Sequence, residues 1–267
     1  MDLLYVCMIV LILTAVLTEC SPVPMIIAHR GASYRAPENT LTAVNLAWEL
    51  GADAVEVDVH LTRDRKIAVI HDPTTKRTAG VELAVSETRS HDLKKLDVGS
   101  FKSPGFAGES IPFLEEVIQT IPGGKSLFVE IKCGSEILPE MKQLIDESGK
   151  HQSFTIIGFD LETISQCKEL MPHVSVCWLA VSEKRHISRT YKPYDPVIIK
   201  HVHEHKLDGL DVHFAGITED FIEAVRYSGM ALYVWTVDDP MVARRLKQFG
   251  VDGITTNRPA WLRELIT

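Results

Sequence analysis

The sequence predicts an α/β protein whose single domain is a (β/α)8 TIM barrel carrying an extra β-hairpin. Three observations lead to this prediction: the 267 residues fit one large domain, strand-like apolar runs alternate with segments of helical spacing, and eight such pairs occur. Alternation of this kind produces a parallel sheet covered by helices. Eight repeats allow that sheet to close on itself.

Short apolar or β-branched runs predict the barrel strands. These runs are Met25–His29, Ala54–Val59, Leu127–Ile131, Phe154–Gly158, Val174–Leu179, Gly209–Val212, Leu232–Val237 and Gly253–Thr256. Helical spacing between them predicts the helices, several of which end at a glycine that suits the position after the last turn. They begin at a cap at Asn39 or Thr40, at Pro112, at Ile137, and near residues 161, 195, 221, 241 and 259.

A further strand-like run, Lys66–His71, follows the second barrel strand after only four residues. A parallel crossover needs about a dozen residues, so this run must form an antiparallel hairpin with the preceding strand. If Asp64 and Arg65 form a two-residue loop, His71 lies opposite Asp58. The non-periodic stretch at about 73–110 is then predicted to be an insertion that forms a lid over the barrel mouth.

The chain opens with an apolar run from Leu3 to Leu17, which is short for a membrane span and typical of a secretory leader. Residues 1–20 are therefore predicted to be a signal peptide or a lipoprotein-type leader ahead of a domain at 24–267. This predicts an exported protein: periplasmic, secreted or membrane-anchored. A membrane would be contacted only through this segment, if it is retained or lipidated.

Composition excludes some classes of partner and site. With 28 basic and 36 acidic side chains the formal charge is -8, which argues against a protein that coats nucleic acid. The five cysteines show no zinc-like spacing. The three that lie beyond the predicted leader are expected to be small buried apolar residues rather than to form a Cys167–Cys177 disulfide. The histidines of the 201–205 segment are expected on the solvated outer face of a helix.

Charged residues gather where the predicted strands end. His29 and Arg30 end the first strand, and Glu130 and Lys132 end the third. Glu56 and Asp58 are two residues apart on the second strand, so their side chains share one face. The carboxyl ends of barrel strands meet at one rim, which predicts that these groups converge there.

Three converging carboxylates, from Glu56, Asp58 and Glu130, would repel one another unless a cation neutralised them. Because all the ligands are oxygens, the sequence predicts one divalent cation, Mg²⁺ or Ca²⁺. The two histidines, His29 and His71, suit a general acid and a general base. Positive charge for a phosphoryl oxygen would come from neighbouring basic side chains, namely Arg30 and Lys132.

Seven motifs occur in order over residues 25–260, and together they resemble the glycerophosphodiester phosphodiesterase family, which is related to phosphatidylinositol-specific phospholipase C-like enzymes. The motifs are residues 28–32 (AHRGA), 36–40 (APENT), 51–59 (GADAVEVDV), 69–72 (VIHD), 129–132 (VEIK), 234–237 (VWTV) and 251–256 (VDGITT). The resemblance implies hydrolysis of a small-molecule glycerophosphodiester to glycerol 3-phosphate and an alcohol.

The resemblance also implies a role for each matching residue. It implies that Glu56, Asp58 and Glu130 bind the metal. It also implies that His29 and His71 exchange protons with the substrate. Phosphate is held by Arg30 and Lys132, and Trp235 lines the glycerol pocket. Glu38 and Asn39 either support the metal ligands or, for Asn39, cap a helix.

Two positions depart from the family pattern: Arg65 stands where glycine is common, and Asn257 where aspartate is usual. Neither is expected to touch the chemistry.

The predicted site contains no serine or cysteine beside a base, so the attacking oxygen must come from water or from the substrate. Attack by the glycerol 2-hydroxyl gains the advantage of proximity and predicts a cyclic 1,2-phosphate. Two alternatives remain at this point: a phospholipase that acts on intact lipid, and a non-catalytic extracytoplasmic binding module.

Overall fold

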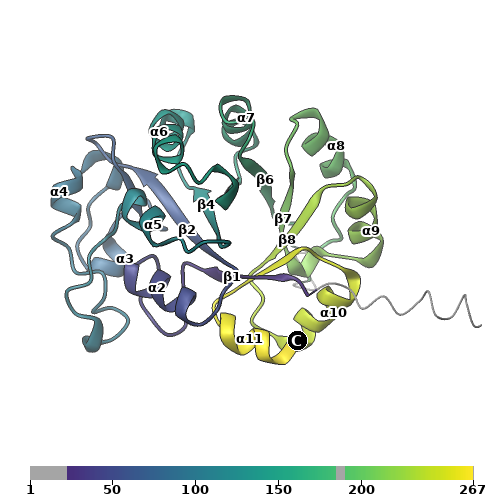
Figure 1. Cartoon of the computed structure of the whole chain (residues 1–267), viewed down its shortest axis with the longest axis horizontal. Coiled ribbons are helices and arrows are strands. Elements are labelled where there is room, and N and C mark those ends of the chain that lie inside the picture. Colours follow the sequence, from purple (N-terminus) through teal and green to yellow (C-terminus); the bar gives the residue numbers. More distant parts are fainter. Residues whose placement is uncertain (1–22, 185–189, 267) are drawn as a thin grey trace, which may run out of the picture.

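A computed structural model describes residues 23–184 and 190–266, so the predicted leader at 1–20 lies outside the described residues. The sheet closes into a barrel because strand β1 pairs in parallel with both β2 and β9. Figure 1 shows the helices arranged around the outside of this barrel. The predicted (β/α)8 barrel is confirmed.

Strand bounds agree with the predicted runs to within about two residues. The barrel strands are β1 Met25–His29, β2 Ala54–Leu61, β4 Ser126–Ile131, β5 Phe154–Gly158, β6 Ser175–Ala180, β7 Gly209–His213, β8 Ala231–Trp235 and β9 Gly253–Thr256. The helices that follow them are α2 Leu41–Glu49, α5 Leu114–Thr120, α6 Leu138–Ser148, α7 Leu161–Leu170, α8 Val197–Glu204, α9 Glu219–Tyr227, α10 Pro240–Phe249 and α11 Pro259–Ile266. None of the helices in the described ranges is both long and apolar enough to cross a membrane.

Apolar side chains fill the barrel interior and the layer between strands and helices. Ile27, Ala54, Phe128 and Ile157 belong to an interior cluster that also contains Cys177. Burial of such side chains removes apolar surface from water and is the main stabilising contribution to the fold. The thiol of Cys177 is free, as expected for a cysteine that serves as a small apolar residue.

Local sequence sets the helix ends. Thr40 caps α2, where its side-chain oxygen accepts a hydrogen bond from the backbone nitrogen of Ala43. Gly149 and Gly250 follow α6 and α10 with φ of +64° and +83°, the left-handed conformation that glycine adopts without strain. Capping by Asn39, one of the two predictions for that residue, is therefore wrong.

The β2–β3 hairpin forms, but its register differs by one residue from the prediction. Strand β3, Ile67–Val69, runs antiparallel to β2, with Val69 opposite Val59. The loop contains three residues rather than two, because the backbone nitrogen of Thr62 donates to Lys66 and Arg65 adopts a left-handed φ of +62°. His71 is therefore not opposite Asp58.

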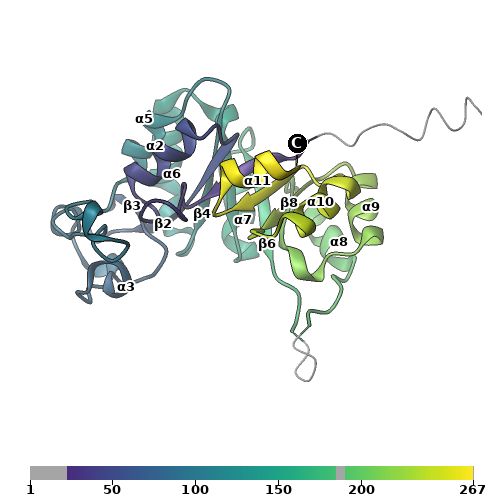
Figure 2. The same cartoon turned by 90° about the horizontal axis from the view of Figure 1, so that it is seen from below.

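The insertion after the hairpin is folded. It contains the short helices α3 Lys76–Ala79 and α4 Ser90–Leu93, and its Val85 and Leu93 form a second apolar cluster together with Ala68 of β3. Figure 2 shows this insertion beside the hairpin, at one side of the barrel. A lid function for it stays a prediction.

Candidate active site

A cavity of about 290 Å³ opens at the carboxyl ends of the barrel strands. Most of the residues that the sequence predicts to form the functional site line this cavity. The lining consists of His29, Arg30, Glu56, His71, Glu130, Lys132, Ile157, Phe159, Leu179, Asp211, Trp235, Thr236 and Thr255. The strand ends therefore bring together residues that are far apart in the sequence.

Three carboxylates form a cluster in which one oxygen from each of Glu56, Asp58 and Glu130 lies within 4.8 Å of the others. Strand register explains this, because β2 and β4 pair in parallel with Asp58 opposite Glu130. Glu56 Oε1 and Asp58 Oδ1 are buried and have no hydrogen-bond partner among the described residues. Such oxygens are costly to bury alone, and a hard divalent cation satisfies them.

The electrostatics of the cluster match this arrangement. Burial raises the pKa of Glu56 well above its usual range, and the charges of Asp58 and Glu130 raise it further. Burial and Asp58 also raise the pKa of Glu130, to about 7. For Asp58, burial is outweighed by Arg30 and then Lys132, so its pKa is lowered.

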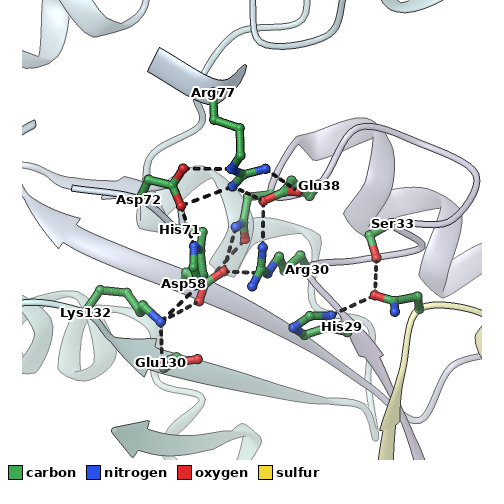
Figure 3. Close-up of polar contacts among 12 residues, drawn as sticks. His29, Arg30, Ser33, Glu38, Asp58, His71, Asp72, Arg77, Glu130 and Lys132 are labelled. Carbon is green, nitrogen blue, oxygen red and sulfur yellow. Dashed lines mark hydrogen bonds and ion pairs between the residues drawn. The ribbon is translucent and has the colours of Figure 1, made fainter. Parts of the chain in front are cut away.

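Neighbouring groups hold each carboxylate in place, as Figure 3 shows for Asp58 and Glu130. The side-chain amide of Asn39 donates from Nδ2 to Asp58 Oδ2 at 2.8 Å. The Lys132 ammonium donates to Glu130 Oε1 at 2.6 Å. The backbone nitrogen of Arg30 donates to Glu56 Oε2 at 2.8 Å.

The two histidines have different partners. The Nδ1 atom of His29 lies 2.7 Å from Asn257 Oδ1, whereas that of His71 lies 2.6 Å from Asp72 Oδ1. Burial, followed by the charge of Arg30, lowers the pKa of His29. In both histidines Nδ1 faces an acceptor, so Nε2 is the nitrogen that points away from the ring's side-chain oxygen partner. In His71 this Nε2 lies 3.2 Å from Lys132 Nζ, which can donate a hydrogen bond to it.

The contact of Asn257 with His29 corrects the expectation that this position does not touch the chemistry. Asn257 follows β9, which pairs with β1 where the barrel closes, so residues at opposite ends of the chain meet. Nothing in the local sequence around Asn257 indicates its partner, because only barrel closure brings the two together.

A rim of ion pairs surrounds this centre. Arg77, from α3 in the insertion, pairs with Glu38 and Asp72, and Glu38 also pairs with Arg30 at 2.8 Å. The hydrogen bond from Arg77, together with the one from His71, lowers the pKa of Asp72 to about 2. Glu38 thus lies outside the carboxylate cluster and holds two arginines. Sequence reasoning missed Asp72 and Arg77, although Asp72 directly follows a nominated histidine.

The opposite wall of the cavity is apolar. Trp235 makes an edge-to-face contact with Phe159, with ring centroids 5.7 Å apart. Asp211, on β7, also lines the cavity, and its Oδ1 is buried and has no hydrogen-bond partner within the described ranges. Burial raises its pKa well above the usual range. Sequence analysis did not predict Asp211 as a site residue, although a lone carboxyl group in an otherwise apolar strand could have indicated it.

The histidine segment at 201–205 lies on outer helix α8, away from this cavity, as predicted. His201 is partly exposed and pairs with Glu204, and His205 Nδ1 lies 2.8 Å from Ser165 Oγ.

Comparison with known proteins decides the family. Residues 29–261 match the model of the glycerophosphoryl diester phosphodiesterase family. The chain belongs to this family. A glycerophosphodiester phosphodiesterase of Caldanaerobacter subterraneus is 34% identical over 91% of this chain and 97% of its own. A human lysophospholipase D is 21% identical over 90% of this chain and 85% of its own.

Among solved structures, a phosphodiesterase of Oleispira antarctica, in complex with the product sn-glycerol-3-phosphate, is similar to this chain with a TM-score of 0.82. It is 26% identical, and the match covers 91% of this chain and 97% of that one. A glycerophosphodiester phosphodiesterase is an enzyme, which excludes the non-catalytic binding module that the sequence left open.

Proposed function

We propose that the cavity hydrolyses glycerophosphodiesters to glycerol 3-phosphate and an alcohol in a metal-dependent reaction that uses His29 and His71. One observation carries this proposal. A buried cluster of three carboxylates contains two oxygens without a hydrogen bond among the described residues, and Glu56 and Glu130 of this cluster line the same cavity as the two histidines. Perturbed carboxylates and histidines in one cleft are typical of a hydrolytic centre.

Glu56, Asp58 and Glu130 would hold one divalent cation, Mg²⁺ or Ca²⁺. Their oxygens fit a hard cation, and their mutual repulsion is relieved by positive charge. When bound, the cation supplies charge that favours the ionised form of a substrate hydroxyl.

Two basic residues are placed for the phosphate group. Arg30 and Lys132 both line the cavity and are partly buried, with side chains 18% and 17% exposed. Ion pairs hold both side chains in position, Arg30 with Asp58 and Lys132 with Glu130. Held in this way, they offset negative charge that develops on the phosphoryl oxygens. Trp235 contacts the glycerol carbons from the other wall.

The two histidines exchange protons through Nε2. One takes the proton of the glycerol 2-hydroxyl while the other donates a proton to the leaving alcohol, and the hydroxyl oxygen forms a bond to phosphorus as the bond to the alcohol breaks. This step produces a cyclic 1,2-phosphate. The roles reverse as water opens the ring, so both histidines return to their initial protonation states.

A substrate panel tests the reaction. It contains glycerophosphocholine, glycerophosphoethanolamine, glycerophosphoinositol, a lysophospholipid and an intact phospholipid, each with Mg²⁺, with Ca²⁺ or with excess chelator. The lysophospholipid is included because the human relative is a lysophospholipase D. We expect turnover of the deacylated substrates that stops with chelator. Full activity in chelator contradicts metal dependence, and turnover of intact lipid alone favours the phospholipase.

An analogue without the glycerol 2-hydroxyl tests the cyclic intermediate. It is expected to bind but not to turn over, because it lacks the internal nucleophile. Rapid hydrolysis of this analogue would favour direct attack by water instead.

Export is proposed on the basis of the apolar leader at 1–20 alone. Expression with and without these residues, followed by fractionation and N-terminal sequencing, tests it. Full-length protein confined to the cytoplasm with an intact leader would contradict export.

A further inference from the structure

The side chain of Asn257 lies between a proposed catalytic histidine and an aspartate. Its Oδ1 is 2.7 Å from His29 Nδ1, and its Nδ2 is 2.6 Å from Asp238 Oδ2. Asp238 precedes α10 and Asn257 follows β9, so the three groups come from three separate parts of the barrel rim. They form a chain of two hydrogen bonds that ends at the cavity.

The orientation of the Asn257 amide is determined by its neighbours. A carboxylate only accepts hydrogen bonds, so the amide group that faces Asp238 must be the NH₂. Asp238 is itself held, because its Oδ1 accepts from the backbone nitrogen of Asn257 at 2.9 Å and from Thr256 Oγ1 at 2.8 Å. On the other side, Ser33 Oγ donates to Asn257 Oδ1 at 3.0 Å. The carbonyl oxygen of the amide therefore faces His29.

An amide oxygen also only accepts, so His29 Nδ1 must carry a hydrogen. We infer that Asp238 and Asn257 are positioning residues that hold His29 in the Nδ1-protonated tautomer and direct Nε2 to the substrate. This inference rests on the proposed function for the role of His29 as a proton carrier. In the opposite tautomer, Nε2 would carry a hydrogen and could not accept the proton of a hydroxyl group.

The two proposed proton carriers are thus oriented by different means. Asp72 contacts His71 directly through a carboxylate, which can accept a hydrogen bond through either of its oxygens. Asn257 can accept only through one end of its amide, so it needs Asp238 to hold that end toward His29. A carboxylate at position 257 would place an oxygen against Asp238 Oδ2, which explains why an amide suits this place beside Asp238.

Exchange of the two side chains tests the hydrogen-bond chain. Asn257→Leu removes the acceptor without a large change in volume, and we expect kcat to fall at least about tenfold with KM changed less than about threefold. Asp238→Asn alone opposes two NH₂ groups and should also lower kcat. The double variant D238N/N257D restores a donor and an acceptor in the right order. It should therefore be more active than Asp238→Asn alone or Asn257→Asp alone.

The matched control is Asn45→Asp, the same chemical change on the exposed face of α2, which should leave kcat unchanged. A double variant no more active than the better of Asp238→Asn and Asn257→Asp would overturn the inference, as would kcat within about twofold of wild type in Asn257→Leu. If Asn257→Leu does not fold, comparison of D238N/N257D with D238N decides.

The tautomer can also be read without any activity. Two-bond ¹H–¹⁵N NMR spectra of ¹⁵N-labelled protein distinguish the two tautomers of a neutral imidazole, with His29→Gln used to assign the signal. We expect the Nδ1-protonated form in the wild type, and a mixture in Asp238→Asn. An Nε2-protonated His29 in the wild type would overturn the inference. Absence of phosphodiesterase activity in the wild type would contradict only the proposed function, because the NMR result stands independently.

Discussion

The two walls of the active-site cavity differ in chemistry. The wall built by β1, β2, β4 and the segment after β3 carries the charged groups, among them His29, Glu56 and His71. The wall built by β5 to β8 presents Phe159, Leu179 and Trp235, with the buried carboxyl of Asp211 from β7 among them. In the charged wall, two carboxylate oxygens have no hydrogen bond among the described residues, whereas in the apolar wall the rings of Phe159 and Trp235 pack against each other.

From this difference we expect the charged wall to place the reactive groups and the apolar wall to contact the substrate. Reactive groups must be held within a few tenths of an ångström, and the charged wall achieves this with a dense set of hydrogen bonds. The apolar wall contributes surface and exclusion of water, which depend less on exact placement. Substitutions in the charged wall should therefore affect turnover, and those in the apolar wall should affect substrate binding.

The largest effect is expected at the histidines. His29→Ala and His71→Ala should each lower kcat by about 100-fold or more, because each removes a proton carrier. Steady-state kinetics on the best substrate of the panel measures this, with circular dichroism to confirm the fold. Phe159→Ala, from the other wall, is the comparison and should lower kcat far less. A near-normal rate in either histidine variant would remove that residue from the mechanism.

A metal-ligand variant should have the next largest effect. Glu56→Gln keeps the size of the side chain but removes a charge from the carboxylate cluster, so the metal concentration for half-maximal activity should rise about tenfold or more. Metal titrations of activity and calorimetric titrations of the apoprotein measure this shift. Glu223→Gln on the exposed face of α9 is the matched control. Unchanged metal dependence in Glu56→Gln would contradict the assignment of the metal site.

Trp235→Ala should sharpen the contrast between the walls. Loss of the indole ring removes apolar contact with the substrate, and KM should rise about tenfold while kcat changes by less than about threefold. The indole Nε1 also donates to the backbone oxygen of Asp211 at 3.2 Å, so Trp235→Phe separates loss of this bond from loss of the ring. A fall in kcat with unchanged KM in Trp235→Ala would place this residue with the charged wall.

The smallest effect expected is a pH-dependent change in stability. Without metal, the pKa of Glu130 is raised from its usual 4.5 to about 7. The stability contributed by its protonated form is complete below about pH 4.5 and is lost as the pH rises through about 7. A bound cation favours the ionised form instead, so the metal-induced increase in Tm should be larger, by about 3 °C, at pH 8 than at pH 5.5.

Thermal unfolding with Mg²⁺ or with chelator at both pH values measures this difference, and Glu130→Gln should diminish it. An equal metal effect at the two pH values would show that Glu130 does not couple metal binding to protonation.

Much of the fold could be predicted from local sequence. Apolar runs of four to eight residues and helical spacing depend only on the period of each element, and the barrel strands lie where these runs predict them. The carboxylate cluster was predictable for the same reason. Glu56 and Asp58 alternate correctly on one strand, and the ends of parallel strands meet at one rim.

Contacts between distant segments were decided by the tertiary structure. The hairpin register depended on whether Arg65 would adopt a left-handed conformation, which costs a non-glycine residue energy. Contacts of Arg65 with Glu140 on α6, which is distant in the sequence, offset this cost. The partner of His29 depended on closure of the barrel, which brings Asn257 across 228 residues of chain. Periodicity within an element says which face is buried, but not which distant side chain meets that face. Only packing of the whole chain selects that partner.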